Sequence, residues 1–207
     1  MVTTAITTLE NDIEFFWQFK QKWKTVEELV YELCNYFLET PYELLKDPIF
    51  PNETLGQLLT CLAYREEPRS TITGFDCVTF VETILALVIS AFCKTSTNFA
   101  KLFDTNLKSL RYRAGIPNFL QRNYFFICVD WIPNNQWLVK DVTRKICDNV
   151  SYATTKIDKL SWLYQHKLLL PYKKDLTLNN LAKALAEIKI SLPVVPSILP
   201  YIPTLEL

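Results

Sequence analysis

The residue best placed for chemistry in this 207-residue sequence is Cys77. Asp76 before it is a good helix N-cap, and the apolar run behind it predicts a buried helix from Cys77 to about Phe92. A thiol on the first turn of a helix lies at the positive end of the helix dipole, which favours the nucleophilic thiolate. Such a position suits nucleophilic catalysis. Spacing alone also allows the alternative that Cys77 is a small apolar residue of the core, as free cysteines often are.

The sequence offers few partners for such a thiol. His166 is the single histidine and therefore the only imidazole for general acid–base work. It lies near a predicted helix end, where a surface histidine close to the C-terminal dipole is the simpler interpretation. One histidine excludes zinc sites with two or more histidine ligands. The three glycines form no phosphate-binding loop pattern, so we expect neither a metal nor another cofactor.

The six cysteines are widely spaced, and no two form a C-x-x-C pair. In an apolar-rich chain of this length, that spacing favours free thiols in a reducing compartment. The N-terminus lacks the basic and apolar regions of a signal peptide, which indicates a cytoplasmic protein or one exported without a recognisable signal. The most apolar run, residues 84–93, is too short to span a bilayer. Lys plus Arg equals Asp plus Glu at 22 each, so the charge gives no reason to expect a nucleic-acid partner.

Helical patterns dominate the elements that must position Cys77. Capping signals and apolar spacing predict helices at residues 26–38, 55–64, 77–92, 97–113, 157–166 and 178–188. The β-prone residues around Pro133 predict an antiparallel hairpin within residues 124–143. Four prolines within residues 193–203 predict an extended segment. We therefore expect a helix-rich α+β fold with an aromatic extension at residues 1–24, a main domain at 25–192 and a proline-rich tail at 193–207.

Several ordered motifs carry a resemblance to a known family. Residues 74–87 read G-F-D-C-V-T-F-V-E-T-I-L-A-L, which resembles the signature F-D-C-[VT]-T-[YF]-V-E-T-x-L-A-L. The flanking segments that agree in order are T-P-Y at 40–42, L-G at 55–56, Y-R at 64–65, L-R-Y-R-A-G at 110–115, R-N-Y-F at 122–125, D-W-I-P-N-N at 130–135 and K-D-V-T at 140–143. Together they resemble the bacterial N-acetylmuramoyl-L-alanine amidase-like family, once described as the domain of unknown function fourteen-sixty. That family looks like a branch of the NlpC-type papain-like cell-wall hydrolases.

The resemblance implies a fold, a substrate and a nucleophile. The fold would be papain-like around the central cysteine-bearing helix, with the hairpin near Pro133 at the start of its sheet. Cys77 would attack an amide carbonyl in a peptidoglycan stem peptide or its link to muramic acid, through a thioester. The residues expected to cap the helix and shape the site are Asp76, Thr79, Glu82, Tyr124 and Asp130.

Two positions depart from the family pattern. Tyr124 stands where the family often has histidine. Tyrosine is a poor base at neutral pH because the ordinary pKa of its hydroxyl is about 10. The family's catalytic histidine is expected in an S-H-V-G string beyond Y-[LI]-P, but only four residues follow Pro203 here. We therefore expect the histidine-bearing segment to be absent, with His166 as the remaining candidate base.

Three functional interpretations stay open at this point. The chain is an active cysteine amidase, an inactive family member that binds its ligand, or a helical interaction module whose proline-rich tail binds a partner. A sheet that lacks its later strands would leave an open edge, which favours pairing with a second copy as a homodimer.

Overall fold

The structure, a computed structural model, describes residues 23–43, 74–93, 98–117, 121–123, 126–165, 177–187 and 192–204. The chain divides into two compact units. The first comprises Met1–Lys46 with Glu67–Pro117, and the second comprises Asp47–Glu66 with Asn118–Leu207. The helix expected at residues 55–64 lies outside the described residues, and so do His166 and Tyr124.

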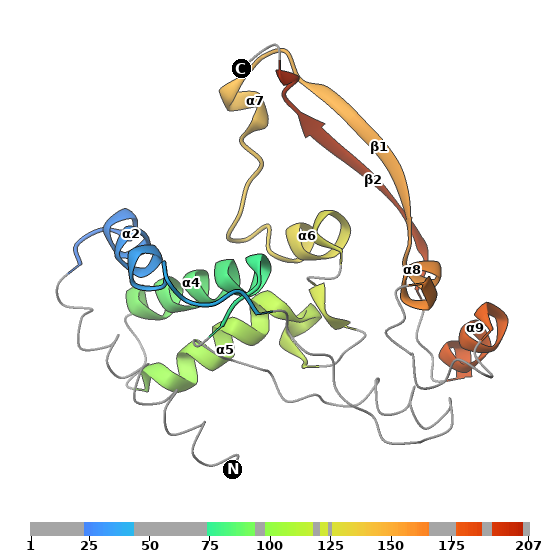
Figure 1. Ribbon diagram of the computed structural model, residues 1–207, viewed down its shortest axis with the longest axis horizontal. Helices are drawn as coiled ribbons and strands as arrows, with labels where there is room; N and C mark the ends of the chain where they lie inside the picture. The colour runs from blue at the N-terminus through green and yellow to red at the C-terminus, as the bar shows by residue number, and fades with distance from the viewer. Residues whose placement is uncertain are drawn as a thin grey trace. The chain divides into compact units, whose positions relative to one another are not determined.

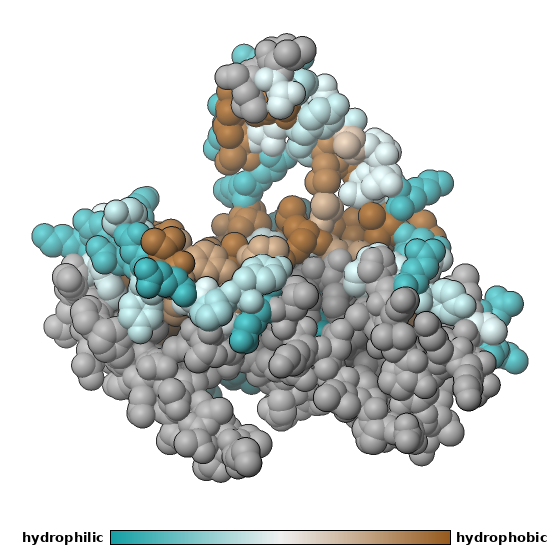
Figure 2. All heavy atoms as spheres, viewed as in Figure 1, coloured by the Kyte–Doolittle hydropathy of each residue, from teal (hydrophilic) through white to brown (hydrophobic). Residues whose placement is uncertain are grey.

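Three helices form the described part of the first unit (Figure 1). Helix α2 (Val26–Tyr36), helix α4 (Cys77–Phe92) and helix α5 (Phe99–Arg111) all begin where the sequence predicts, to within two residues. Their apolar faces meet in a core, with the following side chains at most 2% exposed: Leu29, Leu33, Ala86, Leu87, Phe103, Leu107, Leu110 and Tyr112. Many of the outward side chains of α2 are hydrophilic (teal in Figure 2).

Each of these helices begins with a side-chain cap. The Thr25 hydroxyl accepts from the Glu28 backbone N–H at 3.2 Å, and the Glu28 carboxylate accepts from the Thr25 N–H, which completes the predicted capping box. The side chain of Asn98 caps α5 by accepting from the N–H of Lys101 at 2.8 Å. Beyond α5, a short 3-10 turn η2 (Arg113–Gly115) ends at Gly115 with a φ of 67°, a left-handed conformation that favours glycine.

The second unit contains the sheet. Strand β1 (Ser151–Asp158) pairs antiparallel with strand β2 (Val194–Tyr201), in a register that sets Ser151 opposite Tyr201 and Asp158 opposite Val194. The extended conformation predicted for the proline-rich segment is confirmed, because β2 lies within it. Most side chains of both strands are exposed, and apolar ones (brown in Figure 2) stand among polar ones on this β ribbon.

Short helical segments make up much of the rest of the second unit. They are the π-helix η5 (Ile127–Trp131), then α6 (Ile132–Asn134), α7 (Thr143–Ile146), α8 (Lys159–Gln165) and α9 (Leu178–Glu187). Helices α8 and α9 confirm the helices predicted there. Strand β1 was not predicted from the sequence.

The hairpin expected around Pro133 is wrong. Residues 127–134 are helical, and the antiparallel pairing occurs instead between residues 151–158 and 194–201. Proline fits the first turn of a helix, where its missing N–H has no helical partner, and Pro133 occupies that position in α6. The Asn123 side-chain oxygen also accepts from the Asn134 amide at 2.9 Å, across the bend. Such tertiary contacts override the β propensity of the aromatic run.

Candidate active site

The site begins with a short parallel bridge that delivers the chain to α4. Tyr42 pairs with Phe75, where the Glu43 N–H donates to the Phe75 carbonyl at 2.9 Å and the Phe75 N–H to the Pro41 carbonyl at 3.0 Å. The Phe75 ring is 5% exposed and meets the ring of Phe37 edge-on at 5.2 Å. The backbone immediately before the cysteine helix is therefore anchored in the core of the first unit.

Asp76 is the N-cap of α4, as the sequence predicts. Its carboxylate accepts from the backbone N–H groups of Val78 at 2.9 Å and Thr79 at 2.8 Å. The Thr79 hydroxyl accepts in return from the Asp76 N–H at 2.9 Å. This reciprocal cap takes up the second and third free N–H groups of the helix and leaves the first, that of Cys77, outside it.

Cys77 is the first residue of α4, and its side chain is exposed. The interpretation of Cys77 as an apolar core residue therefore does not fit its position. The rest of the helix is largely buried, so the thiol stands at the surface on the first turn of a rigidly held element. The other described cysteines, Cys34, Cys93, Cys128 and Cys147, are not in disulfides, and each is half-buried.

Glu82 does not line the surface near the thiol. Its side chain is 0% exposed and accepts from the Arg111 Nε at 2.8 Å, where Arg111 is 3% exposed. This ion pair joins α4 to the end of α5. A second polar contact joins the same helices, because the Asn106 amide donates to the Ser90 hydroxyl at 2.9 Å. The role of Glu82 in the structure is thus to fix the helix that carries Cys77.

Asp130 lies in the second unit and is paired as well. The Lys159 ammonium donates to its two carboxylate oxygens at 2.6 and 2.7 Å, and both side chains are buried. This pair joins η5 to α8. Neither cationic partner can be identified from the sequence alone: Arg111 falls within the L-R-Y-R motif, but neither Arg111 nor Lys159 has a spacing that would signal its carboxylate.

Glu43 is another residue that the sequence did not single out. A Cβ placed on Gly74 would lie 2.6 Å from the Glu43 carboxyl group, so this side chain packs directly over the glycine backbone. The Glu43 carboxylate therefore lies against the backbone of Gly74, the residue three positions before Cys77 along the chain. In the part of the chain that the structure describes, no cluster of three or more His, Cys, Asp or Glu side chains could hold a metal. No helix within the same residues is long and apolar enough to cross a membrane.

The family follows from a comparison over most of the chain. The model of the family described as N-acetylmuramoyl-L-alanine amidase-like (AmiA-like) matches residues 33–207. The chain belongs to this amidase-like family. No curated protein matches the chain significantly.

Solved structures agree with the fold of an amidase-like protein. Two crystal structures of an N-acetylmuramoyl-L-alanine amidase from Bacteroides uniformis, at 1.07 and 1.15 Å resolution, are 24% identical to this chain, with a TM-score of 0.51. The match covers 87% of this chain and 67% of that one, so this chain spans about two thirds of its length. At that identity the similarity shows the fold alone. A putative xylanase from Bacteroides fragilis is 27% identical over 79% of this chain and 63% of its own, with a TM-score of 0.47.

Proposed function

We propose that this amidase-like protein is a cysteine-dependent hydrolase of NlpC-type papain-like fold that cleaves an amide bond in peptidoglycan. The observation that carries the proposal is the exposed thiol of Cys77 on the first turn of a capped and buried helix. A reactive group gains from being held on a rigid element because its geometry toward the substrate is fixed in advance. Family membership supplies the class of substrate.

The reaction would proceed through a thioester. The Cys77 sulfur adds to the amide carbonyl carbon, the C–N bond breaks, and the amine leaves with a proton. Water then adds to the thioester carbon and releases the carboxylic acid and the thiol. The backbone N–H of Cys77 is the candidate donor to the oxyanion, because Asp76 occupies the next two N–H groups. Asp76 and Thr79 act as positioning residues through the cap.

Proton transfer requires a base that the buried carboxylates do not supply. The Glu82 and Asp130 side chains are each held in a buried ion pair. The sequence contains one imidazole, His166, and in this proposal it is the candidate base.

A second candidate function is a ligand-binding family member without turnover. The single histidine of the sequence, which does not match the family motif, favours it. Loss of general acid–base catalysis costs typically about 10²–10⁴-fold in rate. Both functions require binding of the peptide, but only the hydrolase cleaves it, so one set of variants separates them.

The test is hydrolysis of N-acetylmuramoyl-L-alanyl peptides by the purified chain, followed as newly released amine. We expect Cys77→Ala to abolish hydrolysis, and Cys93→Ala at the other end of the same helix to retain it. His166→Gln is expected to lower the rate by about 10²-fold or more. Hydrolysis that survives Cys77→Ala would refute the proposal. Binding of the peptide without any turnover would establish the second function instead.

A further inference from the structure

A cavity of about 520 Å³ lies within the second unit, and all its lining residues belong to that unit. Its walls come from η5, the end of β1 and helix α8. The apolar lining includes Phe126, Val129, Ile157 and Trp162, and the charged lining is Lys156 and Asp158. This volume falls within the range of sites that hold small molecules.

Two contacts hold the walls of the cavity together. The buried Asp130–Lys159 ion pair joins η5 to the start of α8 at 2.6 and 2.7 Å. The rings of Phe126 and Trp162 meet edge-on with centroids 4.9 Å apart, which packs the same two elements against each other. The Lys159 ammonium also lies 5.4 Å from the centre of the Phe126 ring. The cavity is thus built on a fixed aromatic surface.

The two charged side chains of the lining differ in what they already bind. The Asp158 carboxylate accepts from the Ser161 N–H at 2.9 Å and from the Ser161 hydroxyl at 2.7 Å, which caps α8. Lys156 is exposed, and its ammonium has no ion-pair partner among the residues that the structure describes. A ligand therefore meets a carboxylate that already accepts hydrogen bonds and an exposed ammonium beside an apolar surface.

We infer that this cavity binds a small carboxylate attached to an apolar body, of the type of an N-acylated amino acid. The carboxylate would pair with the Lys156 ammonium, and the apolar body would contact the Phe126 and Trp162 rings. Apolar pockets with a few polar groups that orient the ligand are the usual form of such sites. This binding site is independent of the amide hydrolysis proposed for Cys77.

Calorimetric titration with N-acetyl-L-phenylalanine tests the charge requirement, with its neutral amide as the matched ligand. We expect the acid to bind about tenfold more tightly than the amide, and Lys156→Gln to remove that difference. Lys145→Gln, on α7 and outside the lining, is the control and should leave binding unchanged. Equal affinity for acid and amide, no binding, or full binding by Lys156→Gln would each overturn the inference.

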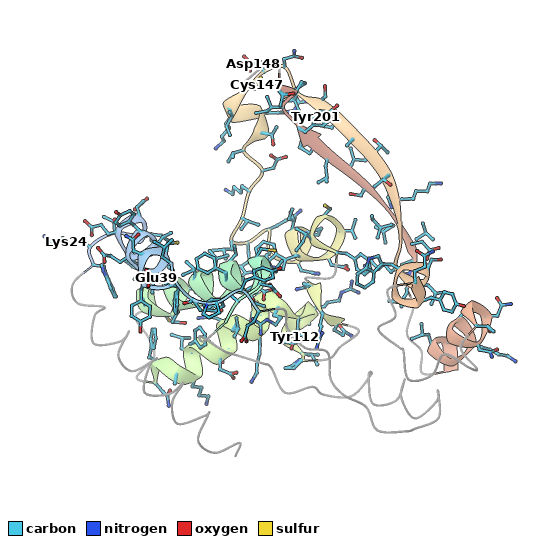
Figure 3. The ribbon with its side chains drawn as sticks, in the orientation of Figure 1. Lys24, Glu39, Tyr112, Cys147, Asp148 and Tyr201 are labelled. Carbon is cyan, nitrogen blue, oxygen red and sulfur yellow. The ribbon has the colours of Figure 1, made fainter. Side chains whose placement is uncertain are left out.

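Protection of Cys128 from alkylation locates the bound ligand. Cys128 lines the cavity, whereas Cys147 lies four residues before Ser151, which begins β1 and pairs with Tyr201 at the other end of the ribbon (Figure 3). We expect the acid to slow N-ethylmaleimide labelling of Cys128 and to leave labelling of Cys147 unchanged. Binding should also persist in Cys77→Ala, which separates this inference from the hydrolase. Unchanged labelling of Cys128, or loss of binding in Cys77→Ala, would place the ligand elsewhere and contradict it.

Discussion

Replacing Glu82 by alanine is expected to lower the free energy of unfolding of the first unit by about 3–5 kcal/mol. The Glu82 carboxylate is 0% exposed, and the Arg111 side chain that it binds at 2.8 Å is 3% exposed. Removing the carboxylate takes away the group that the buried Arg111 guanidinium binds through its Nε. The desolvation of that charge dominates the cost, because little solvent reaches it to compensate.

Urea unfolding, monitored by hydrogen exchange in peptides from α4 and α5, measures this change in the first unit alone. With a urea slope of about 2 kcal/mol per M, the expected loss moves the midpoint down by about 2 M. Asp104→Ala is the matched control, since it breaks a partly exposed ion pair with Lys108, four residues later on α5. That loss should stay below about 0.5 kcal/mol.

A double variant separates charge burial from packing. Glu82→Leu combined with Arg111→Met replaces both charges by apolar groups, and we expect this double variant to be more stable than Glu82→Ala alone. If Glu82→Ala were no more damaging than Asp104→Ala, the buried pair would not be what fixes the cysteine helix.

Three further predictions concern caps and close contacts. Thr25→Ala should lower stability by about 1 kcal/mol in urea unfolding, because it removes the side-chain half of the α2 capping box with Glu28. Gly74→Ala should lower the free energy of unfolding less in a Glu43→Ala background than in the wild type, because its new Cβ would lie 2.6 Å from the Glu43 carboxyl. Additive effects in a double-mutant cycle would contradict that contact. The hydrogen bond from the Ser161 backbone N–H lowers the pKa of Asp158 below 3.8, and the hydrogen bond from the Ser161 hydroxyl is the next largest cause. Its cap therefore stabilises the fold fully above that value and weakens as pH falls through the lowered pKa, so the melting temperatures of wild type and Asp158→Asn should converge at low pH.

Local signals in the sequence predicted the helices of the first unit well. The T-x-x-E pattern at Thr25 and the Asp76 cap each specify a helix start through contacts within four residues, so no distant partner is needed. The exposure of Cys77 follows from the same cap, because the first residue of a buried helix lies at its end.

The second unit was harder to predict because its structure depends on distant residues. Strand β1 pairs with residues about 40 positions later. Neither strand has the alternating pattern of a half-buried sheet, because most side chains of both strands are exposed. The aromatic run before Pro133 has the composition of a strand, but the contact of Asp130 with Lys159 holds it in a helix. Composition alone cannot supply such long-range pairs.

Capture of the acyl-enzyme shows whether Cys77 is the nucleophile. The chain is mixed with an N-acetylmuramoyl-L-alanyl peptide, quenched in acid within the first turnover and digested with pepsin, which cuts at Phe and Leu residues between Cys77 and Cys93. The peptide masses are then measured by mass spectrometry. We expect one mass increase, equal to the acyl part of the substrate, on the peptide that contains Cys77 and none on the peptide that contains Cys93. Amine release with no acyl adduct on Cys77, or an adduct on another residue, would contradict it.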